Sequence, residues 1–544
     1  MLVSQSFDST NWQKARYYGT EYKLCEFSDS LKKRLNDNST IDAEIHLPHI
    51  NDFVPSNFEV EKPLREKVAD YAELIMDTDK VRLWHKKDDT FFVPKAYTRF
   101  LLRSPLAYAT PLQAVKCELY HKLLVDELNE LSYFADIAGL KYDFTNTSDG
   151  MMLTVEGYNH KLGVLLQKVS EHLKNLEVKP ERFNLIKEKL TRSLKNFKFN
   201  EPYHLSGYYI SYVSQDFVWT YEEKLDCIDQ IDVNSLNALI KEMYNNSHIE
   251  GFVHGNIDKE ESIKLVEILT SALGFRPLPS LIRFSTSRSH ILPQGSNTIF
   301  KECAGNPENL NSSIEYYIEI GDYDDVTLKA KSSLFSTIMT EPCFDQMRTK
   351  EQLGYIVFGG SRNQKGRLGY RILIQSEREA IFLETRVEAF IRKMECILND
   401  LTETEFQKFI DVTVAQLLEK DKNLKQEFSR LWSHIKNHYY DFHRRKLEVE
   451  ILKKLTKQEI IDFYKEYISI ESKNRRKLSA WIESQVKKEE ICKNNYSEEE
   501  KKEIQKILEK NVILVGLENV ANFKKGLRLE KSPMPVQGVW MSKL

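Results

Sequence analysis

The sequence has no zinc-protease nucleus. None of its 13 histidines stands in an H-E-x-x-H or H-x-x-E-H sequence, the spacings in which one helix supplies two zinc ligands and a general base. His434 and His438 have helical spacing, but no glutamate follows His434, so we interpret them as spare histidines on a helix rather than metal ligands. We therefore expect no catalytic residue and no metal site in this chain.

Cysteine and long apolar runs are also scarce. Seven cysteines are scattered without a C-x-x-C pair, a pattern typical of reduced thiols in an intracellular protein. No run approaches the length of a membrane span, and the first residues lack the charged and apolar regions of a signal peptide. We expect a cytosolic (cytoplasmic) chain with no membrane contact.

A large excess of charge of either sign is missing as well. The formal net charge is −3, whereas nucleic-acid-binding domains are usually basic, so we expect no nucleic-acid partner. The chain ends in Ser542, Lys543 and Leu544. A terminal S-K-L is a peroxisomal address read by a receptor, which predicts a peroxisomal pool beside the cytosolic one.

The chain of 544 residues is too long for a single hydrophobic core. The order of its predicted strands and helices repeats along the sequence. Tyr142 and Tyr355 occupy matching strands 213 positions apart, and Phe183 and Phe406 open matching long helices 223 positions apart. Hairpins and helices are mixed in each copy. The fold class that we predict is α+β, with two homologous domains, each a largely antiparallel sheet with helices packed on one face.

Composition suggests five segments. Residues 1–18 are too few for a domain and are interpreted as the remnant of a preceding one, which favours a fragment of a longer protein. The polar stretch 19–51 is predicted to be a linker. We expect the first α/β domain at 52–284, the second at 285–531, and a tail at 532–544.

Residues 344–355 are the best candidate for binding. Arg348 carries a permanent charge and donates paired hydrogen bonds to carbonyl or carboxylate groups. Tyr355, at the start of a predicted strand, offers a hydroxyl, and Phe344 on the preceding helix offers an aromatic wall. Gly354 and the following Gly359-Gly360 pair indicate a loop of close approach rather than plain core.

The segment that carries these residues, EPCFDQMRTKEQLGYIVF, resembles the signature of the insulin-degrading-enzyme family of pitrilysin-type inverzincin zinc metallopeptidases. YYGTEYK, PSNFEV, AGLKYDFTNT, VEGYNHK and RVEAF extend the resemblance over residues 14–530, and the match is to the C-terminal half of that family. The resemblance implies the pitrilysin/LuxS-like metallohydrolase fold. It implies four homologous domains in two bowl-shaped halves that close around small peptides.

The resemblance also implies how the work is divided. Zinc and its ligands belong to the N-terminal half, which this chain lacks and which would be its partner. Arg348 and Tyr355 would reach the substrate at that zinc, with Phe344 as a neighbouring chamber contact. The whole enzyme is expected to be a homo-oligomer.

The family binds nucleotide such as ATP, or other polyanions, in its last domain. The matching positions are Leu418, Glu419, Lys420, Asp421, Lys422, Asn423 and Leu424. Asp421 and Asn423 depart from the more basic family pattern, so a solvated helix end is the alternative interpretation.

We interpret the chain as the C-terminal half of a zinc metalloendopeptidase that degrades small peptides such as insulin. It would bind and orient substrate in the closed chamber without being catalytic alone. Two alternatives remain open: a non-enzymatic peptide-binding regulator, and a scaffold subunit like the core proteins of the respiratory chain.

Overall fold

The computed structural model describes residues 6–7, 11–37, 49–61, 69, 71–279, 286–486 and 496–533. The predicted targeting residues Ser542, Lys543 and Leu544 lie outside these ranges. The chain divides into two compact units, Met1–Asp52 and Phe53–Leu544, which are described separately.

The first unit contains a short antiparallel hairpin, β1 (Gln13–Lys14) and β2 (Glu21–Tyr22), and one helix, α1 (Asp29–Asn36). The Ser28 hydroxyl caps α1 by accepting a hydrogen bond from the Leu31 amide. The helix falls inside the predicted linker 19–51, so that stretch is not wholly irregular. The roles of residues 1–18 as a remnant and 19–51 as a linker stay predictions.

The second unit contains two large sheets. The first sheet has the order β3-β4-β8-β5-β7-β6, with β9 paired to β8. Its strands are β3 (Glu73–Asp77), β4 (Val81–Lys87), β5 (Lys95–Arg103), β6 (Leu140–Thr147), β7 (Gly150–Tyr158), β8 (Asn246–Gly255) and β9 (Arg276–Pro277). All neighbours are antiparallel except β4 with β8 and β8 with β9.

Helices cover one face of the first sheet with a continuous apolar core. They are α2 (Pro111–Glu127), α3 (Asn129–Ile137), α4 (Asn159–Asn175), α5 (Pro180–Phe197), α7 (Tyr221–Ile228), α8 (Val233–Asn245) and α9 (Lys259–Leu273). Leu119 and Leu123 of α2 are buried there, as their helical spacing predicts. Leu128 separates the first two of these helices, because it is at once the C-cap of α2 and the N-cap of α3.

The second sheet has the order β13-β14-β12-β15-β11-β16. Its strands are β11 (Asn297–Cys303), β12 (Ser312–Asp322), β13 (Ile356–Ser361), β14 (Arg367–Ser376), β15 (Arg476–Glu483) and β16 (Val512–Val515). The strands β10 (His290–Ile291) and β17 (Arg528–Leu529) pair separately. Its helices are α11 (Val326–Phe344), η1 (Asp345–Lys350), α12 (Ala380–Asp400), α13 (Glu403–Leu417), α15 (Arg444–Leu452), α16 (Lys457–Phe463), η2 (Tyr464–Ile468), α17 (Glu498–Lys510) and α18 (Leu517–Lys525).

The two sheets share one topology, which confirms the internal repeat. From its β6 edge the first sheet runs β6-β7-β5-β8-β4, and from its β13 edge the second runs β13-β14-β12-β15-β11. In both runs the first three pairings are antiparallel and the last is parallel. The fold is therefore α+β with two homologous, largely antiparallel halves, whereas the boundary predicted between residues 284 and 285 stays a prediction.

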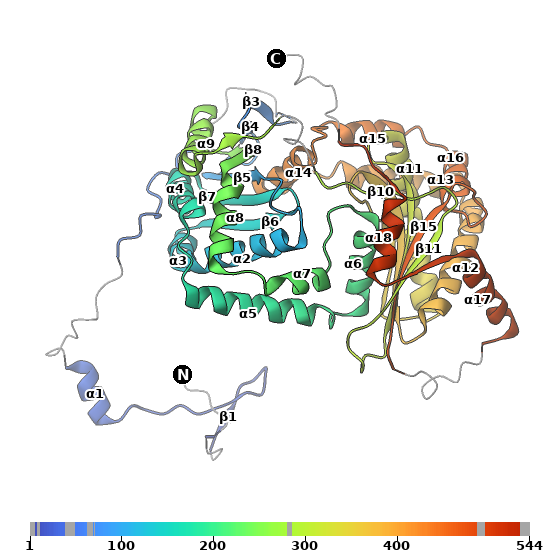
Figure 1. Ribbon diagram of the computed structural model, residues 1–544, viewed down its shortest axis with the longest axis horizontal. Helices are drawn as coiled ribbons and strands as arrows, with labels where there is room; N and C mark the ends of the chain where they lie inside the picture. The colour runs from blue at the N-terminus through green and yellow to red at the C-terminus, as the bar shows by residue number, and fades with distance from the viewer. Residues whose placement is uncertain are drawn as a thin grey trace. The chain divides into compact units, whose positions relative to one another are not determined.

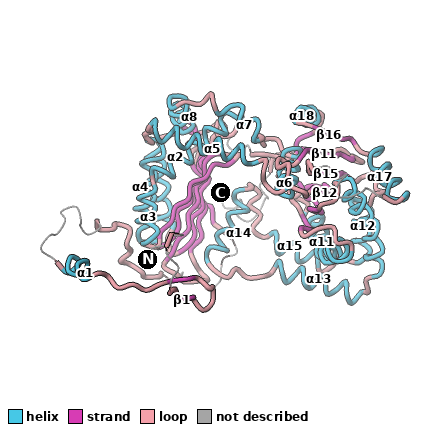
Figure 2. The backbone as a smooth tube through the Cα atoms, turned by 90° about the horizontal axis from the view of Figure 1, so that it is seen from below, coloured by secondary structure: helices cyan, strands magenta, loops and turns pink. Residues whose placement is uncertain are grey.

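One helix of each half packs on the sheet of the other half, an arrangement that the sequence did not predict. Helix α6 (Pro202–Ser214) packs Tyr209 against Phe300 of the second sheet, and α14 (Leu424–Lys436) stacks Phe428 on Phe252 of the first. Figure 2 shows α14 on the opposite side of the first sheet from α2 and α4. In Figure 1, α6 lies beside β11 and β15. These reciprocal contacts join the halves through apolar surfaces.

Candidate functional site

The candidate binding segment begins where α11 changes into a wider turn. Pro342 lies inside α11 and has no N–H for the helical ladder, and the chain continues beyond Phe344 as the π-helix η1. The Glu351 amide closes this turn by donating to the Gln346 carbonyl over 3.0 Å. Single π-turns are rare and occur mainly at functional sites.

The side chain of Arg348 lies close to two aromatic rings. Its guanidinium carbon is 4.8 Å from the centre of the Phe344 ring and 4.5 Å from that of Tyr355. Phe344 precedes Arg348 by one helical turn, and Tyr355 follows it in the loop after the turn. The structure therefore brings together the three residues predicted for substrate binding and places the cation within cation–π distance of both rings.

This arrangement is open to solvent. The Tyr355 residue is 79% exposed and Phe344 is 42% exposed. Tyr355 comes just before β13, which begins at Ile356, so it belongs to the loop rather than to the strand predicted there. Within the described residues, no hydrogen bond or ion pair is recorded for the Arg348 guanidinium or the Tyr355 hydroxyl. Both groups are thus free to donate to a bound molecule.

The loop that returns Tyr355 to Arg348 is fixed by backbone geometry. Gln352 has a φ of 50°, and the Leu353 amide donates to the Met347 carbonyl over 3.0 Å. A Cβ on Gly354 would lie 1.9 Å from the Gln375 carbonyl oxygen. Only glycine fits there, which confirms the close approach predicted from the sequence.

Tyr355 lines a cleft of about 660 Å³. The walls are residues 352–356, residues 375–378 at the end of β14, Asn311, and Glu201 with Tyr203 at the start of α6. The lining is mixed: tyrosine rings and aliphatic groups alternate with amides and carboxylates. A cleft of this size and composition suits a stretch of peptide chain.

The neighbouring cysteine and the histidines at helical spacing do not form a site. Cys343, next to Phe344, is fully buried, and burial raises the pKa of its thiol to about 12, so it is no nucleophile. Burial, with nearby arginines, lowers the pKa of His434 to about 4. His438 accepts a hydrogen bond from Arg103 and lies 3.0 Å from the Tyr440 hydroxyl. Among the described residues, no group of three or more His, Cys, Asp or Glu side chains is placed to hold a metal ion.

The segment predicted to bind polyanions is the connection between α13 and α14. Lys422 pairs with Glu419 over 2.9 Å, and Asp421 accepts from Arg430 over 2.9 Å. Asn423 caps α14. Three charges of the loop, those of Glu419, Asp421 and Lys422, are therefore paired within the chain, and polyanion binding stays a prediction.

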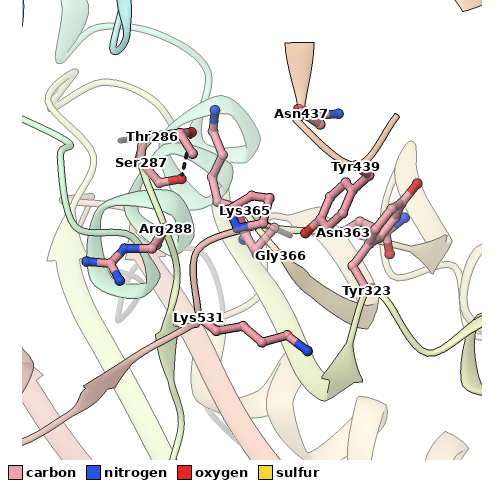
Figure 3. A pocket seen from close by; sticks show the side chains of 12 residues that line it. Thr286, Ser287, Arg288, Tyr323, Asn363, Lys365, Gly366, Asn437, Tyr439 and Lys531 are labelled. Atoms are coloured by element: carbon pink, nitrogen blue, oxygen red, sulfur yellow. Dashed lines mark hydrogen bonds between the residues drawn. The ribbon is translucent and has the colours of Figure 1, made fainter. Parts of the chain in front are cut away.

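A second cavity, of about 250 Å³, lies where residues 286–288 meet the chain just after β12 and just before β14 (Figure 3). Two of its cations already have partners, because Arg288 donates to the Glu530 carbonyl and Lys531 lies 3.2 Å from Asp324. Tyr323 and Tyr439 pack together on one side of it. We interpret this cavity as part of the seam between the two halves.

Sequence reasoning missed the contacts that hold the π-turn in place. Glu351 accepts two hydrogen bonds from Arg386 and one from Gln346. Arg386 is 35 positions away on α12, so no local pattern linked the two. In the described part of the chain, no helix combines the length and the apolar character needed to cross a membrane.

Comparison with known proteins agrees with this fold. The family model described as the middle or third domain of peptidase_M16 matches residues 1–227, and the model of the PqqF-like C-terminal lobe domain 4 matches residues 334–432. The chain is 38% identical over 487 residues to the insulin-degrading enzyme of Homo sapiens, covering 88% of this chain and 47% of that protein. It is 33% identical over 486 residues to the peroxisomal insulin-degrading enzyme-like 1 of Arabidopsis thaliana, covering 88% of this chain and 49% of that protein.

Among solved structures, pitrilysin superposes with a TM-score of 0.79 at 22% identity, over 96% of this chain and 53% of that one. A peptidase M16 inactive domain from Pseudomonas fluorescens superposes with a TM-score of 0.57 at 12% identity, over 76% of this chain and 98% of that one. The chain spans about half the length of the curated relatives it matches. The chain belongs to the M16 family of peptidases, which includes the insulin-degrading enzymes and pitrilysin.

Proposed function

We propose that this chain is the substrate-holding half of a zinc endopeptidase that cleaves small peptides such as insulin. The observation that carries the proposal is the Arg348 guanidinium, held within cation–π distance of the exposed rings of Phe344 and Tyr355 beside the 660 Å³ cleft. A cation and a hydroxyl held in place before a ligand arrives are suited to a peptide carbonyl that gains negative charge during hydrolysis.

Each of the three side chains would have its own task. The Tyr355 hydroxyl would donate to the scissile carbonyl oxygen as that oxygen becomes an oxyanion. Arg348 would orient a neighbouring carbonyl or carboxylate, because its N–H donors form a rigid planar set. Phe344 would keep the guanidinium oriented and offer its exposed face to an apolar side chain of the peptide.

The zinc would come from the N-terminal half, the proposed partner. That partner would contribute the metal, its ligands and the general base, and zinc there would activate the attacking water. Closure of the two halves would bring Tyr355 to the scissile bond and would exclude bulk water, as lids do in other enzymes. This division of labour is why we propose that the chain does not hydrolyse peptides alone.

Peptide binding by the isolated chain tests the first half of the proposal. A fluorescent insulin B-chain peptide should bind, measured by anisotropy, and Arg348→Ala should weaken binding roughly tenfold, the loss of a charge-assisted hydrogen bond. Arg192→Ala is the matched control, because Arg192 is exposed and pairs only with Glu188 on its own helix. Equal binding by both variants would remove Arg348 from the site.

Three further parts of the proposal concern the setting of the chain. We propose a cytosolic pool and a peroxisomal pool addressed by Ser542–Leu544, a homo-oligomeric whole enzyme, and weak polyanion or ATP binding at residues 418–424. Exposed Lys420 supports polyanion or ATP binding, whereas the pairing of Lys422 with Glu419 opposes it. Deleting the terminal tripeptide and imaging a tagged chain tests the address.

A further inference from the structure

The carboxylate of Glu351 holds the π-turn that carries Arg348 in place through hydrogen bonds. Glu351 accepts from Arg386 twice, from Nε over 2.6 Å and from Nη2 over 2.9 Å, and from the Gln346 amide over 2.7 Å. The Gln346 side-chain oxygen in turn accepts from Lys393 over 2.6 Å. Gln346 and Glu351 stand on either side of Arg348, so the network closes the turn around it.

The anchor of this network is rigid. Arg386 and Lys393 lie one above the other on α12, whose opposite face is buried through Leu383, Val387 and Ile391. The bidentate fork between Arg386 and Glu351 fixes both distance and orientation. From Glu351 only three residues lead to Tyr355, and two of them are fixed by the Leu353 hydrogen bond and the close approach of Gly354.

The network is partly buried and charged. The Arg386 side chain is 32% exposed and that of Glu351 is 16% exposed. Burial acts to raise the pKa of Glu351, but hydrogen bonds from Arg386 and Gln346 outweigh it and lower the pKa overall. The Glu351 carboxylate is therefore charged at neutral pH, and the network persists there.

We propose that Glu351 and Arg386 are positioning residues that hold Arg348 against the rings of Phe344 and Tyr355, and so set the geometry of the peptide site. The role in peptide cleavage rests on the proposed function, whereas the positioning itself is a property of this chain alone. A peptide ligand would therefore meet a site whose orientation is imposed by α12, a helix that contributes none of the three proposed contacts.

The positioning is measured on the isolated chain by placing 3-fluorotyrosine at position 355 and recording its ¹⁹F chemical shift. Arg348→Ala in the same labelled chain gives the shift of the unstacked ring. Arg386→Gln should move the wild-type shift at least halfway to that reference, and Arg386→Lys should move it less, because one of the two hydrogen bonds survives. Arg392→Gln is the matched control, since Arg392 is on the same helix and pairs with Glu503 instead.

Two results overturn the inference: a shift that Arg386→Gln leaves unchanged, or an Arg348→Ala reference identical to wild type, which means that no stack exists in solution. Thermal melting accompanies the NMR measurement, and the melting temperature of Arg386→Gln should stay close to that of the control. A large fall in melting temperature with an unmoved shift would make the pair purely structural.

The second arm uses the enzyme reassembled with its N-terminal half. Arg386→Gln should lower kcat/KM roughly tenfold, mainly through kcat, since displacement of a positioned group by about an ångström costs up to about a hundredfold. Arg386→Lys should recover part of the loss, and Arg392→Gln should lose nothing. If Arg348→Ala and Arg386→Gln both leave cleavage unchanged while the ¹⁹F shifts move as expected, the proposed function fails and the positioning stands.

Discussion

The guanidinium of Arg348 lies 4.5 Å from the centre of the Tyr355 ring, although seven positions and the end of a helix separate the two residues. The stack links the π-turn η1 to the loop before β13. Because Tyr355 is 79% exposed, the contact does little to bury apolar surface. Its main consequence is that neither donor can be moved without disturbing the other.

Removing the second ring tests this linkage. Phe344→Ala leaves Arg348 stacked on one face only, and an exposed cation–π contact contributes about 0.5–1 kcal/mol. We expect peptide affinity of the isolated chain to fall roughly two- to fivefold, measured by anisotropy. Tyr133→Ala removes another exposed ring, on α3, and should leave affinity unchanged. An equal effect of both changes would mean that Phe344 acts only as general apolar surface.

The loop should tolerate no side chain at position 354. Gly354→Ala forces the Gln375 carbonyl away from a Cβ that would otherwise lie 1.9 Å from it, at a cost of about 1–3 kcal/mol. Thermal stability and peptide affinity should fall together. Gly163→Ala, inside α4, is the opposite control. The new Cβ would lie 3.5 Å from Leu265, an ordinary contact, and replacing glycine by alanine should stabilise the helix by up to about 1 kcal/mol. A stable Gly354→Ala with normal binding would contradict the loop geometry.

The seam beneath α14 gives a pH prediction. Glu427 lies 3.0 Å from His254 and 3.2 Å from Lys86, and these contacts outweigh burial and lower its pKa to about 2. A carboxyl whose pKa is lower in the folded chain stabilises the fold above its unfolded pKa and loses that contribution as the pH falls through the folded value. Glu427→Gln should therefore cost about 3 kcal/mol at neutral pH.

The stability gap between wild type and Glu427→Gln should narrow as the pH is lowered below about 4.5. Thermal melting at a series of pH values measures it. Glu188→Gln, which breaks an exposed pair with Arg192, is the control and should show no gap at any pH. A gap that is constant with pH would mean that the ion pairs of Glu427 are not responsible.

Zinc content is a separate prediction. The two histidines at helical spacing have other contacts, since His434 packs against Phe442 and His438, beyond the end of α14, against Tyr440. Elemental analysis of the dialysed chain should find well below one zinc per chain. A stoichiometric ion that disappears in His434→Ala would instead establish a metal site here.

Strong periodicity made much of the fold predictable. The alternating residues 152–157 lie in β7, Pro180 opens α5, and Ser497 with Glu500 forms the capping box that begins α17. Such elements are decided locally, by alternation and by cap chemistry. The exchange of α6 and α14 is decided by tertiary contacts. Its one sequence signal is that α6 contains no Asp, Glu, Lys or Arg, as expected for a helix enclosed on more than one side.

The candidate site shows the same limit. Arg348, Tyr355 and Phe344 were found because their segment is distinctive, and Gly354 because glycine marks close approach. The stacking of Arg348 between two rings depends on a π-turn that no simple periodicity encodes. Arg386 was missed because its role depends on a partner 35 positions away.

The central claim, that this chain supplies donors to a zinc site in another half, is tested most directly by reassembly. Mixed with a zinc-bearing N-terminal half of an M16 relative, the chain should restore cleavage of an insulin peptide. Tyr355→Phe should lower kcat about a hundredfold with a smaller change in KM, the loss of one preorganised donor, while Tyr133→Phe should match wild type. Folded halves that bind each other at saturation without cleaving peptide, or a Tyr355→Phe enzyme with wild-type kcat, would contradict the account.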